Sequence, residues 1–243
     1  MSFPGSVLDF LLPGTCLVCG KELDAFENSV CLNCLSDLPR TFFSSRERNP
    51  MADRLNHLIQ EDSSGYEPYS FATALFHYTP GDPYSSITKE LKYGRNFPAG
   101  RFFSAMLARE IAEAGQFRDV DLVIPVPLHW TRYWSRGYNQ AAVIAAVIAG
   151  RLGMPMDRRI LCRSRRTVTQ TRLTEEEKAL NVRGAFRLVR SGHCRTILSA
   201  SSHILLVDDV FTTGSTIYAC REALREALPA EKRISAATLG FAG

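Results

Sequence analysis

The sequence contains no hydrophobic run long enough to cross a membrane. Its longest apolar stretch covers residues 141–149, whereas a bilayer requires about 20 apolar residues. The first residues lack a basic leader, and Asp9 interrupts a very short apolar run, which is unlike a secretory signal. Internal repeats and low-complexity segments are also absent. We therefore expect a globular, cytoplasmic protein without a membrane span.

The composition is ordinary, but the charge is unevenly distributed. With 243 residues, 45% of them hydrophobic, the chain can form one α/β domain and a small accessory module. The net charge is +4, yet residues 158–195 contain eleven lysines and arginines and only three acids. This segment indicates an anionic ligand, either phosphate or nucleic acid. A solvated arginine-rich surface is the alternative and explains the charge alone equally well.

Four of the seven cysteines form two Cys-x-x-Cys pairs, Cys16 with Cys19 and Cys31 with Cys34, separated by eleven residues. Each pair can direct two thiolates at one centre, and two pairs complete the tetrahedral ligand set of zinc. Four thiolates leave no open coordination position, so the predicted role is structural. So small a module has little core of its own, and zinc would supply much of its stability. An iron–sulfur cluster ranks below zinc, and the spacing disfavours four free cysteines.

Three regions follow one another along the chain. Residues 1–40 form the four-cysteine zinc ribbon, residues 41–69 are a polar connector with a short helix at 51–60, and residues 70–243 form the main domain. Apolar runs and helical spacing predict strands at 71–78, 122–126, 204–207 and 234–239, and helices at 87–93, 101–114, 138–152 and 215–227. Short apolar strands that alternate with helices indicate an α/β fold with a parallel sheet covered on both faces.

The strongest local signal lies at residues 203–216. A buried strand leads into Asp208 and Asp209, and a turn of small residues precedes the next helix. Ligands of parallel sheets bind at the carboxyl ends of the strands. The turn offers backbone N–H groups, hydroxyls and a helix N-terminus to a phosphate, and the carboxylates suit neighbouring ribose hydroxyls. The turn residues are Thr212, Thr213, Gly214, Ser215 and Thr216.

Other interpretations of this segment are weaker. The acids could belong to an ordinary turn, with Ser or Thr as a helix cap. A Walker-type nucleotide site lacks its Gly-x-x-x-x-Gly-Lys-Ser/Thr motif in this sequence. Residues 205–216 instead resemble, almost position for position, the phosphoribosyl diphosphate (PRPP) signature of type I phosphoribosyltransferases. The resemblance implies that Asp208 and Asp209 contact the ribose hydroxyls and that residues 212–216 hold the 5′-phosphate.

Further segments carry a more specific resemblance. Residues 91–93, 121–129, 136–140, 163–170 and 181–186 are similar to the ComF family, a cytoplasmic branch of the phosphoribosyltransferase superfamily linked to competence and DNA uptake. The similarity covers nearly the whole chain, including the cysteine module. It implies a type I phosphoribosyltransferase-like fold, PRPP with magnesium as ligand, and single-stranded DNA and other competence proteins as partners.

A ribose diphosphate carries several negative charges, which arginine forks and lysine can bind. We expect this role for Lys92, Arg136, Arg163, Arg165 and Arg166. Residues 167–170 are predicted to begin a loop that closes over the ligand. The sequence departs from the family pattern at Trp130 and Trp134, where basic residues are expected, and at Lys178, where arginine is usual. These tryptophans, which flank Arg132, are either core residues or stacking platforms for nucleobases.

No acceptor-base site can be identified in the sequence, and no catalytic residue is assigned. Two functions therefore remain open: a PRPP-binding protein that handles single-stranded DNA, and an active transferase that moves phosphoribose to a nitrogen acceptor. Residues 16–40 contain two bases, Lys21 and Arg40, against four acids. Any contact with DNA is therefore expected in the arginine-rich segment after residue 158.

Overall fold

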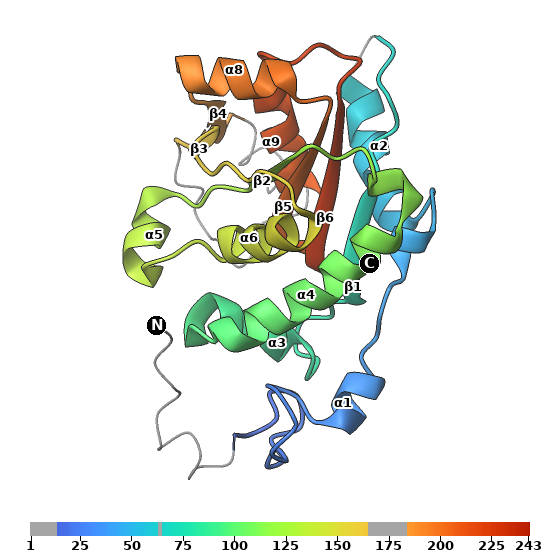
Figure 1. Ribbon diagram of the computed structural model, residues 1–243, viewed down its shortest axis with the longest axis vertical. Helices are drawn as coiled ribbons and strands as arrows, with labels where there is room; N and C mark the ends of the chain where they lie inside the picture. The colour runs from blue at the N-terminus through green and yellow to red at the C-terminus, as the bar shows by residue number, and fades with distance from the viewer. Residues whose placement is uncertain (1–13, 63–64, 165–183) are drawn as a thin grey trace.

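A parallel four-stranded sheet lies at the centre of the computed structural model, which describes residues 14–62, 65–164 and 184–243 (Figure 1). The strand order is β1 (Ala72–His77), β6 (Arg233–Phe241), β5 (His203–Phe211) and β2 (Leu122–Pro125). Neighbouring strands all pair in parallel. The predicted α/β class with a parallel sheet is therefore confirmed.

Helices cover both faces of this sheet. On β5, Ile204 and Leu206 face the side of α2 (Pro50–Asp62) and α9 (Ser215–Arg225), whereas Leu205 and Val207 face the side of α4 (Phe97–Glu113) and α6 (Gln140–Leu152). All four side chains are fully buried. Because successive side chains of a strand alternate between the two faces, a sheet covered on both sides requires an unbroken apolar run.

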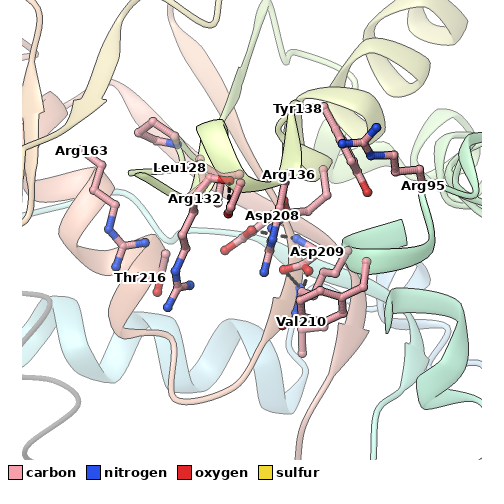
Figure 2. A pocket seen from close by; sticks show the side chains of 16 residues that line it. Arg95, Leu128, Arg132, Arg136, Tyr138, Arg163, Asp208, Asp209, Val210 and Thr216 are labelled. Carbon is pink, nitrogen blue, oxygen red and sulfur yellow. Dashed lines mark hydrogen bonds and ion pairs between the residues drawn. The ribbon is translucent and has the colours of Figure 1, made fainter. Parts of the chain in front are cut away.

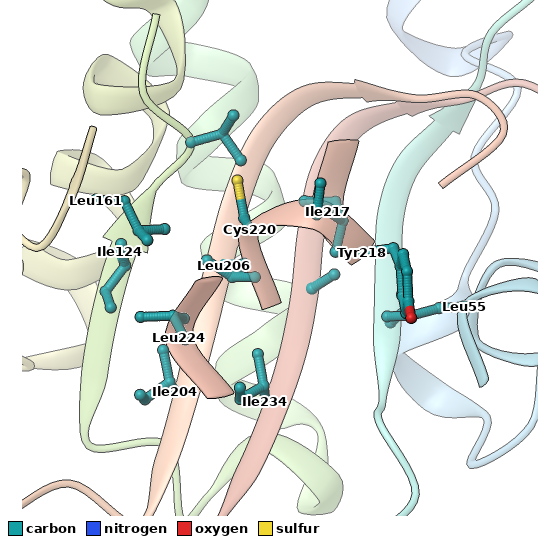
Figure 3. Close-up of a cluster of buried hydrophobic side chains, with 14 of the residues drawn as sticks. Leu55, Ile124, Leu161, Ile204, Leu206, Ile217, Tyr218, Cys220, Leu224 and Ile234 are labelled. Atoms are coloured by element: carbon teal, nitrogen blue, oxygen red, sulfur yellow. The ribbon is translucent and has the colours of Figure 1, made fainter. Parts of the chain in front are cut away.

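Helix α2 lies within the segment predicted to be a polar connector, yet it belongs to the core. Met51, Leu55 and Ile59 occupy one face of the helix and are buried. Leu55 lies in the same hydrophobic cluster as residues of α9, which include the buried Cys220 (Figure 3). The polar composition of the segment comes from the opposite, exposed face of α2 and from its flanks.

Strand β5 is longer than the predicted strand at residues 204–207. Its pairing with β6 continues past Val207, with Asp208 opposite Thr238 and Phe211 opposite Phe241. The two acids therefore lie on the strand itself, held in its regular geometry, and the turn begins only after Phe211.

The remaining described elements are α1 (Leu32–Ser36), η1 (Phe43–Ser45), α3 (Ser85–Lys89), η2 (Glu90–Gly94), η3 (Gly115–Phe117), α5 (Trp130–Arg136), β3 (Leu161–Arg163), β4 (Phe186–Leu188) and α8 (Gly192–Ala200). Strands β3 and β4 form a separate antiparallel pair. The sequence did not predict α5, β3, β4 or α8. Across the described ranges, no helix combines the length and apolarity that a membrane span requires.

The cysteine module packs against the α3–α4 side of the main domain (Figure 1). Cys16, Val30 and Leu38 are buried in the same cluster as Leu75 and Leu91. Polar contacts reinforce this packing: the Tyr84 hydroxyl donates to the Cys34 carbonyl at 3.0 Å, and Arg40 forms an ion pair with Glu110.

Candidate functional site

The turn between β5 and α9 is fixed by its own hydroxyls and by a glycine. Thr213 Oγ1 lies 2.8 Å from Ser215 Oγ. Gly214 has a φ of +85°, and a Cβ atom there would lie 2.7 Å from Cζ of the buried Phe211. Backbone conformation and space therefore both require glycine at this position. Helix α2 supports the turn, because Arg54 donates to the Thr212 carbonyl at 2.6 Å.

A cavity of about 700 Å³ opens at the carboxyl end of β5, where the fold predicts a ligand site (Figure 2). Asp208, Asp209 and Val210 contribute from β5, and Thr216 contributes from the first turn of α9. Five cationic residues line the cavity against these two acids: Lys92, Arg95, Arg132, Arg136 and Arg163. The excess of positive charge suits a ligand with several negative charges.

Lys92 and Asp209 form an ion pair across the cavity floor. Lys92 Nζ lies 2.7 Å from Asp209 Oδ2, and the Asp209 side chain is 7% exposed. Burial alone would lower the pKa of Lys92, but the charge and hydrogen bond of Asp209, with the charge of Asp208, raise it above its usual value. Lys92 therefore remains charged and neutralises one of the two carboxylates.

Asp208 is the carboxylate whose surroundings oppose ionisation. Burial and the neighbouring Asp209 charge raise the pKa of Asp208 to about 8, although Lys92 opposes this shift. Burial also lowers the pKa of Arg163, and the charge of Arg132 acts in the same direction. A ligand that donates hydroxyl hydrogen bonds to Asp208, or a cation bound there, would favour the ionised form and lower the pKa of Asp208.

Helix α5 brings two arginines to the cavity. Gly137 ends the helix with a φ of +80°, and the Asn139 amide donates to the Val126 carbonyl at 2.9 Å, which fixes the helix to the end of β2. Arg136 Nη1 donates to Gln140 Oε1 at 3.1 Å, and its guanidinium lies 4.9 Å from the centre of the Tyr93 ring. These contacts hold Arg136 at the edge of the cavity (Figure 2).

The structure brings six of the predicted site residues together around the cavity: Lys92, Arg136, Arg163, Asp208, Asp209 and Thr216. Thr212, Thr213, Gly214 and Ser215 form the adjoining turn rather than the cavity wall. Arg165, Arg166, Lys178 and the loop expected at 167–170 lie outside the described residues.

Sequence reasoning missed some of the cavity residues. Arg95 and Tyr138 were not assigned to the site, and Arg132 was noted only as the residue between the tryptophans. Arg95 follows Lys92 by one helical turn, a spacing that could have been recognised. Trp130 and Trp134 are 64% and 81% exposed, so the alternative that they are core residues is wrong.

The four cysteines of the N-terminal module converge as predicted. Their Sγ atoms all lie within 4.8 Å of one another, and those of Cys19 and Cys31 are 3.8 Å apart. Tetrahedral zinc with bonds of about 2.3 Å separates its sulfur ligands by about 3.8 Å, so the cluster fits that ion. Gly20, with a φ of +73°, closes the first pair by donating to the Cys16 carbonyl at 2.9 Å.

The Cys16 thiol is prepared for metal binding by the backbone around it. Burial would raise its pKa, but backbone N–H groups, including that of Cys31 at 3.3 Å, lower the pKa to about 6. A thiolate is the form that zinc binds. The cluster can therefore hold a metal ion such as zinc with four sulfur ligands.

These features define an α/β protein with a cation-rich cavity at the end of its parallel sheet and a separate four-cysteine cluster that can hold a metal. No model of a known protein family matches the chain.

The chain is 27% identical over 217 residues to Competence protein F of Haemophilus influenzae, which covers 87% of this chain and 90% of that protein. It is 28% identical over 214 residues to DNA utilization protein YhgH of Escherichia coli (strain K12), covering 85% of this chain and 88% of that protein. The protein of the same name from Salmonella typhi is 31% identical over 153 residues, 62% of this chain and 63% of that protein. These relatives support the resemblance to the ComF family.

Proposed function

We propose that this chain is a ComF-family protein of the phosphoribosyltransferase superfamily that binds PRPP with magnesium in the cavity at the end of β5. The observation that carries the proposal is the pair Asp208 and Asp209 beside the Gly214 turn, facing Lys92 and a group of arginines. The cavity has a group for each of the three parts of PRPP. The carboxylates suit the ribose hydroxyls, the helix N-terminus suits the 5′-monophosphate, and the cations suit the diphosphate.

Each part of the ligand is assigned to its own residues. Asp208 and Asp209 accept hydrogen bonds from the ribose hydroxyls, and residues 212–216 hold the 5′-phosphate. Lys92, Arg136 and Arg163 bind the diphosphate, joined by Arg165 and Arg166. Magnesium arrives with the diphosphate, and the carboxylate oxygens of the cavity are hard ligands of the kind it prefers.

We further propose that the protein acts in DNA uptake, in the cytoplasm, by handling single-stranded DNA. The printed names of the relatives refer to competence and to DNA utilization. The exposed tryptophans of α5, next to Arg132 and Arg136, supply the aromatic and cationic groups that bind single strands without sequence preference. The cysteine module is assigned structural zinc.

Thermal unfolding with PRPP and magnesium tests the binding proposal. Ligand at 100 times its Kd stabilises a protein by about 2.7 kcal/mol, which for a chain of this size raises Tm by ~5–10 °C. The double variant Asp208→Asn with Asp209→Asn should lose this shift while keeping its circular dichroism spectrum. Asp24→Asn with Asp37→Asn, which makes the same charge change at exposed sites, should keep the shift. A full shift in the Asp208 and Asp209 variant would contradict the site.

Transfer of phosphoribose to a nitrogen acceptor stays a prediction, and a second measurement decides it. Diphosphate release is followed with PRPP, magnesium and a panel of purine and pyrimidine bases. Release that depends on one base assigns the protein to the transferases. Stabilisation by PRPP without release with any base leaves a binding protein, in which PRPP is a ligand or regulator.

A further inference from the structure

A second groove, of about 720 Å³, lies beside the PRPP cavity and shares part of its wall. Pro127, Leu128 and Tyr138 line both. The groove runs over α6 and is bounded by Phe97 and Arg101 of α4, Tyr133 of α5 and the segment that follows α6. Among the residues that line this groove, Arg158 and Arg159 belong to the arginine-rich segment predicted to contact an anionic ligand.

The outer face of α6 forms the floor of this groove and is unusually apolar. Ile144 and Ile148 pack against the sheet, as expected for a helix that covers it. The side of α6 that lines the groove carries Ala142, Val143, Ala146 and Val147; Ala146 is exposed and the other three are half-buried. A helix on a protein surface normally carries polar residues on the face turned away from the core. Residues 141–149 are all apolar, so α6 presents an apolar, partly exposed side to the groove.

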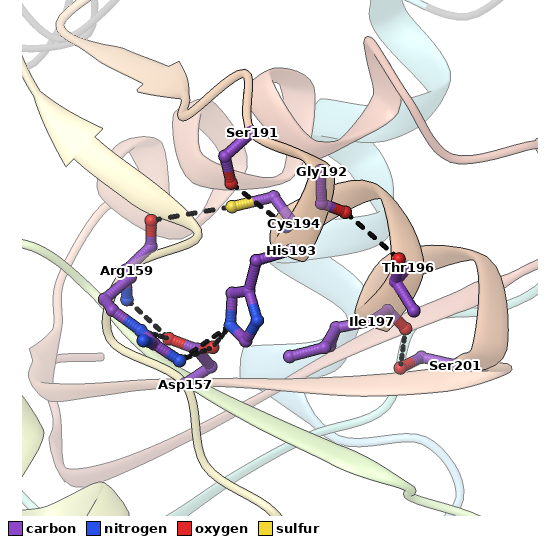
Figure 4. Close-up of polar contacts among 9 residues, drawn as sticks. All are labelled: Asp157, Arg159, Ser191, Gly192, His193, Cys194, Thr196, Ile197 and Ser201. Carbon is purple, nitrogen blue, oxygen red and sulfur yellow. Dashed lines mark hydrogen bonds and ion pairs between the residues drawn. The ribbon is translucent and has the colours of Figure 1, made fainter.

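The wall formed by residues 156–159 is held rigidly in place. Asp157 is buried and binds both Arg159, at 3.1 Å, and His193 of α8 (Figure 4). Burial would raise the pKa of Asp157, but these partners lower it to about 2, so the carboxylate stays ionised. The contacts tie the groove wall to α8.

Two arginines give the groove its charge. Arg101 and Arg158 are exposed on its opposite walls, and neither forms an ion pair with a residue of the described ranges. Arg159 is neutralised by Asp157. Within the part of the chain that the structure describes, no acidic residue lines the groove. An apolar floor with cations on both rims suits an anionic ligand that also carries flat, weakly polar surfaces.

We propose that this groove binds the bases of single-stranded DNA, with backbone phosphates on Arg101 and Arg158. The inference rests on the DNA-handling part of the proposed function and gives that function a location. Bases stack on Phe97 and Tyr133 and lie on the apolar floor, which requires no hydrogen-bonded readout.

An acidic peptide fits less well, because it would bring backbone N–H and C=O groups that need partners. The Asn139 side chain, which supplies a carboxamide to the lining, already donates to the Val126 carbonyl and accepts from Ala141 N. Stacked bases turn their flat faces to the groove floor, and their polar edges can stay in contact with water. Exposed Trp130 and Trp134, on the same helix as Tyr133, extend the aromatic surface beyond the groove.

The test places a carboxylate on the groove floor. Ala146 is exposed, so Ala146→Glu keeps a good helix former without burying a charge. Fluorescence anisotropy with labelled oligo(dT) should show binding at least 10-fold weaker than for the wild type. Ala112→Glu, the same change at an exposed position of α4 outside the groove, should bind as the wild type does. PRPP-dependent stabilisation should be unchanged in both variants.

A second measurement addresses the phosphates. Each phosphate contact to a single strand contributes about −0.7 to the slope of log K against log salt. Changing Arg101 and Arg158 together to Ser should reduce the slope by ~1.4 and weaken binding.

Three results would overturn the inference. Unchanged affinity of Ala146→Glu for oligo(dT) would remove the groove as the site while leaving DNA handling in place. Equal competition by poly-glutamate of matched charge would show that bases are not recognised. Failure of the wild type to bind oligo(dT) at all would overturn both the groove and the DNA-handling role, whereas the PRPP proposal depends only on the stabilisation experiment.

Discussion

Asp208 is a carboxylate in surroundings that oppose its ionisation. It neighbours Asp209 within β5, and its pKa rises to about 8 through burial and that second charge. An acid whose pKa is raised by folding stabilises the folded state fully only below its unfolded pKa, and this contribution disappears as the pH rises through the folded value. Chain stability should therefore fall between about pH 4 and pH 8.

Replacing Asp208 with Asn should remove this pH dependence. Urea unfolding of Asp208→Asn and the wild type at pH 5 and pH 8.5 should show the variant gaining about 1–3 kcal/mol relative to the wild type at the higher pH. Asp24→Asn, at an exposed site, is the matched control and should show no such gain. Parallel curves for Asp208→Asn and the wild type would contradict the assignment of the shift to Asp208.

Gly214 offers a second prediction at the residue scale, with a control in the same chain. Gly214 and Gly81 have φ values of +85° and +88°, but a Cβ at Gly81 meets nothing within 4 Å. Alanine at either position pays for the left-handed backbone, about 1 kcal/mol. The added Cβ of Gly214→Ala would also clash with the Phe211 ring, which should lower the free energy of unfolding by a further ~1–3 kcal/mol. Equal losses for the two variants would show that the turn can shift.

At the scale of elements, α2 links the core to the turn between β5 and α9. Its buried face packs under the sheet, and its Arg54 and Leu58 contact the turn. Leu55→Ala should lower the free energy of unfolding by about 2–5 kcal/mol, as expected for a large side chain removed from a core. Gln60→Ala on the exposed face should change it by less than about 0.5 kcal/mol. If Leu55→Ala lowered the free energy of unfolding as little as Gln60→Ala does, α2 would not be part of the core.

The strands of the central sheet could be predicted from the sequence because each is an apolar run buried on both faces. Helix α5 could not, since Trp130, Tyr133 and Trp134 alternate with polar residues and none of its residues is buried. Strands β3 and β4 have three residues each, too few for a pattern. Helix α2 was predicted as a helix, but its packing into the core was not. Burial of one of its faces depends on a sheet formed by residues distant in sequence.

The candidate site divides in the same way. Asp208, Asp209 and the Gly214 turn are contiguous in sequence and could be recognised together. The Lys92–Asp209 ion pair joins η2 to β5 and depends on the packing of separate elements. The groove over α6 is assembled from α4, α5, α6 and the segment after α6, so no local pattern indicates it.

At the scale of the whole molecule, the cysteine module and the main domain share one hydrophobic cluster. Purified protein should contain one zinc per chain by mass spectrometric metal analysis. Removing the metal by Cys31→Ser or a chelator should lower Tm of the whole chain by ~5 °C or more in a single transition, since binding energy at such a site is folding energy.

Cys162→Ser, at an exposed cysteine outside the cluster, should keep both the metal and the Tm. A separate early transition on metal removal would show that the module unfolds independently. Visible absorption with bound iron would identify an iron–sulfur cluster in place of zinc.

The position of β6 has a consequence for synthesis on the ribosome. This strand, Arg233–Phe241, lies between β1 and β5, so a nascent chain that ends before it has two separate pieces of the sheet, the β2–β5 pair and the single strand β1, without the strand that joins them. Each fragment presents an unpaired strand edge of the kind that aggregates. The turn between β5 and α9, which is translated earlier, cannot gain its final support until β6 emerges from the exit tunnel. Stop codons or stalls within residues 233–241 should therefore yield insoluble protein even though every proposed PRPP-binding residue has been made.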